Sequence, residues 1–509
     1  MRLDELLARS AARFPARPAL ATAGGTERLT YGELDRRAET MREALARHGV
    51  GPGDRVGVYV PKSIPSVTAI LGILKSGAAY VPIDPSAPPS RCAYVVEDCG
   101  LAAIVAASDL LPGLREATTP ELPVLETWGD APGVREIQIV RGPGGERAHD
   151  PRNPLAYILY TSGSTGKPKG VIHTHASALS FVEWCAATFD LSEADTFSSH
   201  APFHFDLSIF DLYVSLLHGG EIVLFGEEIS KQPAAMASTV AEHGISVWYS
   251  TPSVLRLLVE FGQLDQYDWS ALRLVLFAGE VFPVKHLRAL LEKWPAPRYF
   301  NLYGPTETNV CTYFEIPSAI PKDREDPYPI GKVCENDVGK VVDEGDRRVP
   351  VGEEGELLIS GGTVMRGYWN LPERSEKAFQ VDDDGTPWYR TGDLVREADD
   401  GILLFVGRRD RMVKRRGYRV ELGEIEAALY HHPDVVEAAV IAIPGEDGVR
   451  IDAHVTRADG GKGSIIDMKS FCSKELPLYM IPDRFQFHPS LPKTSTDKID
   501  YQALSRGTA

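Results

Sequence analysis

Short apolar runs alternate with amphipathic helical patterns along much of the chain. Apolar spacing predicts helices over residues 3–13, 31–48 and 64–77. Strands are expected at residues 55–60, 78–83, 103–105, 155–159, 221–225, 247–249 and 274–277. Strands that alternate with helices pair in parallel and are covered on both faces. The pattern therefore indicates an α/β protein built on parallel sheets.

The pattern changes near residue 337. Residues 337–404 contain short β-rich runs, such as 355–360, separated by Gly, Pro and Asp turns. This composition predicts a smaller β sheet or barrel. One small αβ unit is expected near the end, with a helix at 422–430 and a strand at 438–443.

A basic segment, residues 407–417, separates these two regions. A run of basic residues is often a solvated surface. Its glycines, and its place between regions of different composition, favour a hinge instead. We place the boundary at Asp410, which divides the chain into domains 1–409 and 410–509.

Length, charge and cysteine usage limit the class of protein. A chain of 509 residues is too long for one core, and its net charge of −17 argues against nucleic acid or an anionic membrane as partner. The acidic N-terminus lacks the apolar core of a signal peptide, and no apolar run reaches membrane-spanning length. The 6 cysteines form no CxxC pair that would indicate a zinc site or a disulfide framework. These features are typical of a cytoplasmic enzyme.

The segment at residues 160–170, YTSGSTGKPKG, carries the strongest chemical signal. It follows the apolar run 155–159. Backbone N–H groups and hydroxyls of such a loop can surround a polyanion, and lysine neutralises part of its charge. A flexible linker is the simpler interpretation, but linkers seldom follow a buried strand or end in Lys-Pro-Lys-Gly. We therefore expect a nucleotide phosphate here.

The spacing of this loop differs from that of the common P-loop. A P-loop has four residues between its first glycine and a Gly-Lys pair that is followed by Ser or Thr. Here only two residues separate Gly163 from Gly166, and Pro168 follows the lysine. Proline also argues against the phosphate-capping helix of a P-loop. The loop thus predicts phosphate binding, but not a kinase.

Three further motifs lie downstream. After an apolar strand, Tyr303 offers a flat face for adenine, Thr306 a hydroxyl for phosphate and Glu307 a carboxylate for magnesium. Asp393 is expected in a tight turn after a strand, where a carboxylate can accept both hydroxyls of a ribose. Lys498 is expected in a turn near the end. Each motif alone is weak, because Gly-Pro turns and surface lysines are common.

Together and in this order, the motifs resemble those of adenylate-forming enzymes, most of all the adenylation domains of nonribosomal peptide synthetases. The resemblance covers almost the whole chain and includes LTYGEL at 29–34, LKSGAAYVPIDP at 74–85 and GRRD at 407–410. One departure is the terminal motif, usually Asn-Gly-Lys, which is TDK at 496–498. The resemblance implies a large N-terminal domain of two parallel-type sheets covered by helices, a small β subdomain, and a small mobile α+β C-terminal domain.

The resemblance also implies a site for ATP and Mg²⁺. Glu307 would hold Mg²⁺, Thr306 would contact the phosphate, and Lys498 would reach the carboxylate and α-phosphate oxygens. These three are the expected catalytic residues. The residues expected to bind the nucleotide are Thr161, Ser162, Gly163, Ser164, Thr165, Lys169, Ala278, Gly279, Glu280, Asn301, Tyr303, Asp393, Phe405 and Arg408.

The chemistry agrees with this assignment. A carboxylate that attacks an α-phosphate brings two anions together, so the site needs positioned cations rather than a covalent nucleophile. In this family the small domain then rotates about a hinge residue, here Asp410, and removes the lysine, here Lys498. The rotation opens a channel for a phosphopantetheine thiol, which would pass near Gly417.

Asp206 identifies the kind of acid that is activated. In amino-acid-activating members, an aspartate at this position binds the substrate ammonium. An unpaired buried carboxylate is costly, so an aspartate facing an apolar pocket implies a cationic ligand. The alternative is a helix N-cap for Leu207 onward.

The rest of the expected pocket carries no second charge apart from Lys498. It is bulky, which favours a compact apolar amino acid such as proline or alanine. The set resembles that of free-standing L-prolyl-AMP ligases of pyrrole-2-carboxyl biosynthesis, with Cys311 as a lining thiol. The expected pocket residues besides Asp206 are Leu207, Phe210, Tyr249, Leu276, Ala278, Leu302, Val310 and Cys311.

The resemblance implies a peptidyl carrier protein acting in trans as the thiol acceptor, since the sequence ends soon after Lys498 without a carrier domain. Coenzyme A is a second possible acceptor, but an ammonium-binding aspartate is more typical of carrier loading. A D-alanine–carrier protein ligase, or a ligase for another small amino acid, is the alternative enzyme. A nucleotide-binding protein without ligase activity is a different class, against which Glu307, Asp393 and Lys498 argue.

Overall fold

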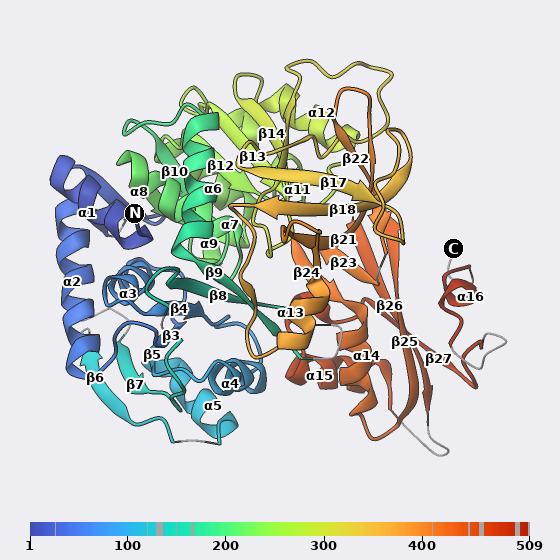
Figure 1. Ribbon diagram of the computed structural model, residues 1–509, viewed down its shortest axis with the longest axis horizontal. Helices are drawn as coiled ribbons and strands as arrows, with labels where there is room; N and C mark the ends of the chain where they lie inside the picture. The colour runs from blue at the N-terminus through green and yellow to red at the C-terminus, as the bar shows by residue number, and fades with distance from the viewer. Residues whose placement is uncertain are drawn as a thin grey trace.

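Two large sheets enclose a central layer of helices (Figure 1). The computed structural model describes residues 1–25, 27–119, 121–128, 136–148, 150–163, 167–409, 411–445, 448–457, 463–493 and 499–506. The central layer consists of α1 (Leu3–Arg13), α2 (Tyr31–Arg47), α3 (Ile64–Lys75), α6 (His175–Thr188), α7 (Leu207–Ile209), the π-helix Phe210–Val214 and α8 (Ser215–His218). The predicted helices are confirmed, apart from residue 48, which lies beyond α2, and residues 76 and 77, which lie beyond α3.

The first sheet is parallel at its centre and antiparallel at its edges. Its strands, in spatial order, are β16 (Lys332–Val333), β15 (Thr312–Ile316), β14 (Arg298–Tyr303), β13 (Leu274–Ala278), β12 (Val247–Ser250), β10 (Thr196–Ser199), β11 (Glu221–Leu224), β1 (Pro18–Thr22) and β2 (Arg28–Thr30). Helices α9 (Glu227–Ser230), α10 (Pro233–Glu242), α11 (Pro252–Phe261) and α12 (Val284–Lys293) lie on its outer side.

The second sheet has the same plan. Its strands, in spatial order, are β19 (Gly367–Tyr368), β9 (Lys169–Thr174), β8 (Leu155–Thr161), β4 (Ala79–Pro82), β3 (Arg55–Tyr59), β5 (Ala103–Ala107), β7 (Ile137–Arg141) and β6 (Val124–Trp128). Helices α4 (Pro89–Asp98) and α5 (Leu111–Ala117) cover its outer face.

Strand periodicity explains how the layers pack. Along β13, Leu276 points into the central layer, whereas Val275 and Phe277 pack against the outer helices. The helices begin where the sequence supplies a cap: Thr30 and Ser63 each start a helix with a reciprocal capping box. The prediction of parallel sheets covered by helices is therefore confirmed.

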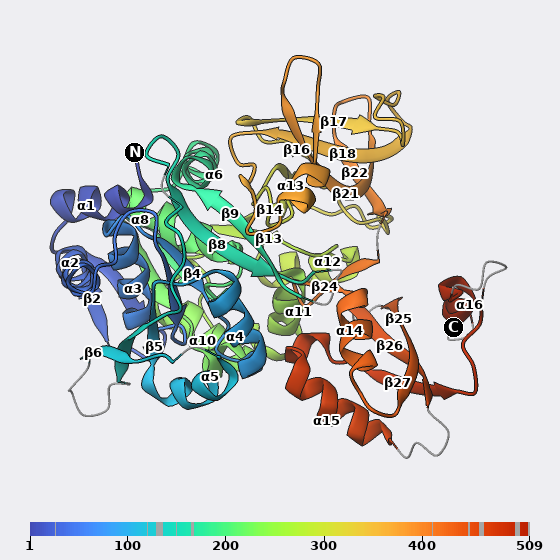
Figure 2. The same cartoon turned by 60° about the horizontal axis from the view of Figure 1, so that its bottom comes forward.

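A separate antiparallel sheet follows and projects from the α/β body (Figure 2). It contains β17 (Asp337–Val342), β18 (Glu354–Gly361), β21 (Pro387–Glu397), β20 (Phe379–Val381) and β22 (Leu403–Arg408), with α13 (Pro372–Ala378) beside it. This confirms the predicted small β region.

Two details of the sequence prediction are wrong. Asp393 lies within β21 and not in a turn after a strand, because β21 continues through a bulge in which Gly392 has φ +72°. The Thr391 hydroxyl donates to the Leu357 carbonyl at this bulge, 2.7 Å away. Tyr303 is the last residue of β14 rather than a residue after the strand.

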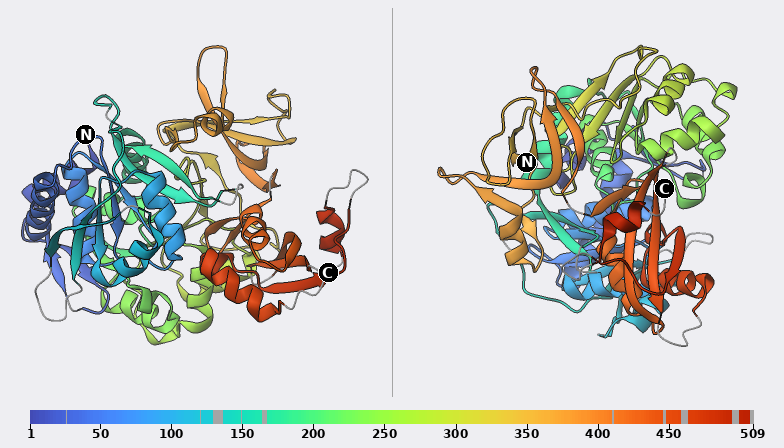
Figure 3. Two further views of the ribbon diagram at one scale, coloured as in Figure 1. Left: turned by 90° about the horizontal axis from the view of Figure 1, so that it is seen from below. Right: turned by 90° about the vertical axis from the view of Figure 1, so that its right-hand side faces the viewer.

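The C-terminal unit is built around a three-stranded sheet (Figure 3). Helices α14 and α15 pack on one face of this sheet, and α16 packs on the other. In the described part of the chain, no helix is long and apolar enough to cross a membrane. The elements of the unit are the hairpin β23 (Met412–Arg415) and β24 (Tyr418–Glu421), α14 (Leu422–Tyr430), β25 (Val435–Gly445), β26 (Gly448–Arg457), α15 (Ile465–Glu475), β27 (Arg484–His488) and α16 (Tyr501–Arg506).

Candidate functional site

The glycine-rich loop joins two antiparallel strands. β8 ends at Thr161, which pairs with Lys169 at the start of β9. A strand rather than a helix therefore follows the loop, which confirms that it is not a P-loop. The Thr161 hydroxyl is buried and has no hydrogen-bond partner within the described residues. Ser164 and Thr165 lie outside those residues.

The C-terminal unit closes over this loop. The Ser162 hydroxyl donates to the Arg419 carbonyl at 2.7 Å, and the Gly163 amide donates to Glu424 Oε2 at 3.1 Å. The other Glu424 oxygen accepts from the Arg91 guanidinium. One hydroxyl and one backbone amide of the loop thus donate hydrogen bonds to residues more than two hundred positions away in the chain.

Glu307 lies at the centre of a buried charge cluster. Its Oε1 accepts from Lys169 Nζ at 2.9 Å and from the Tyr368 hydroxyl at 2.7 Å, and Arg419 Nη1 lies 3.1 Å from Oε1 and 3.0 Å from Oε2. Burial opposes ionisation of Glu307, but Arg419 and then Lys169 outweigh it and hold its pKa well below the ordinary range. Glu307 is therefore a carboxylate with 0% exposure.

Lys169 feels the same crowding from the other side. Burial, and then the positive charge of Arg419, lower its pKa to about 8, although Glu307 opposes the shift. An additional anion beside Lys169 would restore its full charge. The lysine is 2% exposed, so such an anion would have to enter the cluster rather than touch its surface.

Asp393 and Tyr303 come together although they are 90 residues apart in the chain. The Tyr303 hydroxyl donates to one oxygen of Asp393, and Arg408 Nη1 donates to the other at 2.6 Å. The predicted nucleotide residue Asn301 donates instead to the Pro329 carbonyl at 2.7 Å. Phe405 lies on β22, which pairs with the strand of Asp393, β21, and it is 36% exposed.

Asp206 sits next to the first turn of α7 and is 9% exposed. Asp206 occupies the N-cap position of α7, but its side chain makes no capping hydrogen bond to the helix. Burial raises its pKa, while a hydrogen bond from Thr306 and the nearby charge of Lys414 lower it. The carboxyl is thus placed in an apolar setting with only partial compensation.

The apolar residues predicted around Asp206 form one buried cluster. Its members from the prediction are Leu207, Phe210, Tyr249, Leu276, Ala278, Leu302 and Val310. The Phe210 and Tyr249 rings meet edge to face at 5.4 Å. Cys311 packs in a different cluster, with Tyr303 and residues of the antiparallel sheet. Its role in the pocket stays a prediction.

Glu280 connects the first sheet to the hairpin β23–β24. Its Oε1 accepts from the Gly417 amide at 2.7 Å, and its Oε2 accepts from the amide and the hydroxyl of Ser253. Gly279 has φ +94°, and a Cβ built on it would lie 3.7 Å from the Gly417 Cα. The hairpin tip therefore approaches the predicted nucleotide segment 278–280 closely, and the thiol channel near Gly417 stays a prediction.

The same hairpin also makes aromatic contacts through Tyr418. Tyr418 stacks on Tyr479 at 3.9 Å and on Phe205 at 5.5 Å. Phe205 precedes Asp206, so the hairpin reaches the edge of the predicted amino-acid pocket.

Lys498 and Asp410 lie outside the described residues. Ile499, which follows Lys498, packs with Leu491, Leu504 and the face of β25 opposite to α14. Helix α14 supplies Glu424, which contacts the glycine-rich loop. Ile499 is therefore on the side of the unit that faces away from that loop, and Figure 1 shows α16 at the edge of the molecule.

Sequence reasoning missed several residues of the site. Arg419, Tyr368 and Lys414 contact or face the predicted carboxylates. None of the three was predicted as a site residue. The remaining signal is a Gly-x-Arg pattern at Gly417–Arg419, where a cation follows a glycine that permits close approach.

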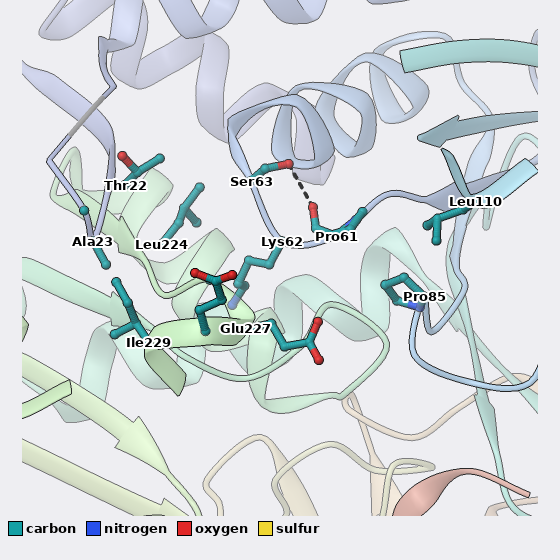
Figure 4. Close-up of a pocket in the computed structure, with 13 residues that line it drawn as sticks. Thr22, Ala23, Pro61, Lys62, Ser63, Pro85, Leu110, Leu224, Glu227 and Ile229 are labelled. Carbon is teal, nitrogen blue, oxygen red and sulfur yellow. Dashed lines mark hydrogen bonds between the residues drawn. The ribbon is translucent and has the colours of Figure 1, made fainter. Parts of the chain in front are cut away.

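A cavity of about 460 Å³ lies away from the predicted site residues (Figure 4). Thr22, Lys62, Leu224 and Glu227 are among its lining residues. None of the predicted site residues lines it. The chemistry predicted from the sequence is concentrated between the two sheets and the C-terminal unit.

The fold is shared with a solved structure. The amide bond synthetase McbA from Marinactinospora thermotolerans superposes with a TM-score of 0.85, covering 100% of this chain and 99% of that one, at 24% identity. At that identity the likeness shows the fold alone.

Sequence comparison identifies the family. Residues 7–369 match the family described as AMP-binding enzyme. Residues 424–498 match the family described as AMP-binding enzyme C-terminal domain. The chain belongs to the AMP-binding enzyme family. An L-proline–L-prolyl-carrier-protein ligase of Pseudomonas fluorescens is 38% identical over 507 residues, 99% of each chain. A protein of the same name from Streptomyces coelicolor is 38% identical and covers 97% of this chain and 94% of that one.

Proposed function

We propose that this protein activates L-proline with ATP as prolyl-AMP and transfers the prolyl group to the phosphopantetheine thiol of a separate carrier protein. The observation that carries the proposal is Asp206, a buried carboxyl beside a wall of large apolar side chains. A secondary ammonium on a compact apolar ring matches both features. The two relatives of matching length carry names with the same substrate and acceptor.

In the first half-reaction, a proline carboxylate oxygen forms a bond to the α-phosphorus of ATP, and pyrophosphate leaves. Enzymes that form adenylates use ATP for this step. Lys169, in the glycine-rich loop, is the buried cation of the described site that neutralises phosphate charge. Asp393 accepts from the ribose hydroxyls, and Tyr303 lines the adenine site. We assign to Lys498 the role of reaching the reacting oxygens from the C-terminal unit.

In the second half-reaction, a thiol attacks the prolyl carbonyl and AMP leaves. We propose that the described arrangement belongs to this step. Gly417 and Tyr418 lie beside Glu280 and Phe205, next to the amino-acid pocket, and Ile499 faces away from the glycine-rich loop. We propose that Lys498 reaches the ATP site by a rotation of the C-terminal unit about Asp410.

Glu307 does not fit a metal ion in this arrangement. Both of its oxygens are taken by Lys169, Tyr368 and Arg419, and the described residues contain no group of three or more His, Cys, Asp or Glu that could hold an ion. Carboxylate oxygen is the ligand type that Mg²⁺ prefers. Mg²⁺ at Glu307 therefore stays a prediction for the arrangement in which Arg419 is withdrawn.

ATP–pyrophosphate exchange with a panel of amino acids tests the proposal. We expect L-proline to give the strongest signal, and a purified holo carrier protein to become loaded with proline as detected by mass spectrometry. Exchange that is stronger with D-alanine or L-alanine than with L-proline would overturn the proline assignment. ATP binding without exchange for any amino acid would overturn the ligase assignment.

A further inference from the structure

A strongly cationic cavity lies between the glycine-rich loop, the antiparallel sheet and the C-terminal unit. Its volume is about 560 Å³. The hairpin and α14 form one wall of it, so the cavity exists only while the C-terminal unit is docked. The charged residues that line it are Lys169, Arg374, Lys377, Arg390, Arg408, Arg411, Arg419, Glu356, Glu421 and Glu426.

The charge of this cavity contrasts with that of the chain. Seven lysines and arginines face three glutamates in it, whereas the whole protein has a net charge of −17. An excess of one sign of charge in a cleft attracts ions of the opposite sign. The excess of cations in the lining therefore favours an anion.

Several of the cations are held by carboxylates of the protein. Arg408 binds Asp393, Arg411 binds Glu426, and Arg419 binds Glu307. These pairs fix the walls of the cavity. Two other cations, Arg374 and Lys377, come from α13 at successive turns of the same helix, so both can face one ligand.

Arg374 of α13 lies close to the glycine-rich loop. Its Nη1 lies 3.7 Å from the position of a Cβ built on Gly163, and its guanidinium is 5.7 Å from the centre of the Tyr368 ring. The same Tyr368 hydroxyl is hydrogen-bonded to Glu307 and Lys169. An anion beside Arg374 would thus be in reach of the loop and of Lys169 without entering the Asp206 pocket.

We propose that this cavity is a binding site for inorganic pyrophosphate, with Arg374 and Lys377 as its cations outside the glycine-rich loop. The inference rests on the proposed function, in which pyrophosphate is the product of the first half-reaction. Guanidinium and ammonium groups are the preferred partners of phosphate oxygens. Because one wall belongs to the C-terminal unit, pyrophosphate bound here contacts both parts of the protein.

The same diphosphate chemistry is present in the β- and γ-phosphates of ATP, so the experiment must separate the two sources. Calorimetric titration of the full-length protein with pyrophosphate, without ATP or proline, measures the cavity directly. The test variants are Arg374→Ala, Lys377→Ala and their combination. Arg347→Ala is the matched control, because Arg347 lies on an exposed turn with its side chain 83% exposed.

We expect the double variant to bind pyrophosphate at least tenfold more weakly, and Arg347→Ala to bind within twofold of the parent. The loss for pyrophosphate should exceed the rise in the KM for ATP at least fivefold. Pyrophosphate affinity within twofold of the parent in a folded double variant would overturn the site. Equal losses for ATP and pyrophosphate would overturn it as a product site and assign the cavity to ATP.

Failure of the proposed function has a different signature. In that case the parent protein gives no proline-dependent exchange, while the calorimetric difference between the parent and the double variant persists. A thermal unfolding midpoint within a few degrees of the parent shows that the variants are folded. The two hypotheses are thus judged by separate readouts.

Discussion

Replacing Arg419 by alanine should separate the two half-reactions. In the docked arrangement its guanidinium lies 3.0 and 3.1 Å from the two oxygens of Glu307, which is 0% exposed. Arg419 belongs to the hairpin of the C-terminal unit, whereas Glu307 belongs to the N-terminal body. Removing the guanidinium therefore weakens this arrangement and leaves an arrangement with the hairpin withdrawn unaffected.

The structure sets the size of the effect. Two unit charges 4 Å apart attract by about 4 kcal/mol at an effective dielectric constant of about 20. Lys169 and the Tyr368 hydroxyl remain on Glu307 after the substitution, so the carboxylate is not left unpaired. We expect a net loss of about 2–3 kcal/mol, which corresponds to roughly 30- to 150-fold.

Two assays measure the half-reactions separately. Proline-dependent ATP–pyrophosphate exchange reports adenylate formation, and single-turnover loading of a holo carrier protein from preformed prolyl-AMP reports transfer. Transfer by Arg419→Ala should fall by the factor above, exchange should change less than fivefold, and Arg419→Lys should recover part of the transfer. Arg396→Ala is the control, because its ion pair with Glu354 is largely exposed. Equal losses in both assays, or no loss in transfer, would refute the reasoning.

Three other predictions concern the pocket, the pH dependence of stability and metal removal. Asp206→Ala should raise the KM for proline by a factor that corresponds to a loss of about 2–5 kcal/mol in binding free energy. The substitution removes the partner of a desolvated ammonium. Burial lowers the pKa of His173 and His200 to about 4 and of His175 to about 3, from 6.5, so the unfolded chain binds more protons between these values. Stability should therefore be lost as the pH falls from about 6.5 towards 4, by about 2 kcal/mol per histidine between pH 7 and pH 5, measured by urea unfolding. EDTA should abolish exchange but leave transfer from preformed prolyl-AMP within twofold, since Glu307 is already neutralised by protein cations in the docked arrangement.

Each of these has a control and a contrary result. Asp265→Ala removes an exposed carboxylate and should leave the KM for proline unchanged. A KM for Asp206→Ala that equals that of the parent protein would place the ammonium elsewhere. His200→Gln should flatten the pH dependence relative to the exposed-site variant His431→Gln. An unfolding midpoint that does not vary between pH 7 and pH 5 contradicts the histidine argument, and loss of transfer in EDTA contradicts the assignment of Glu307.

The sequence predicted the layers of the fold because each depends on local periodicity. The helices at residues 3–13 and 422–430 were predictable to the residue, since amphipathic spacing and neighbouring turns define them. Asp206 and its apolar neighbours were chosen from the family resemblance and not from periodicity, and their role as the amino-acid pocket stays a prediction. The position of Asp393 was not predictable, because a bulge that continues a strand and a turn that ends it use the same Gly-containing sequence.

The contacts between the two parts of the chain could not be predicted from periodicity, and only the Gly-x-Arg pattern at Gly417–Arg419 gave a signal. Arg419 and Glu307 are 112 residues apart, and Gly163 and Glu424 are 261 apart. Whether such groups meet depends on how a small unit docks on a finished surface, and periodicity carries no information about docking. A basic segment between two domains predicts a hinge equally well whether its cations face solvent or a buried carboxylate.

The arrangement around Glu307 suggests why the two half-reactions do not interfere. Lys169 comes from the N-terminal body and stays beside Glu307, whereas Arg419 arrives only with the hairpin. Arg419 lowers the pKa of Lys169 while it is docked, so the hairpin brings a cation into a site that is already positively charged. Glu307 offsets that repulsion, and on our proposal pyrophosphate in the cationic cavity offsets it further. Docking of the hairpin would then be favoured once pyrophosphate has formed, which is the point in the reaction at which the thiol must enter.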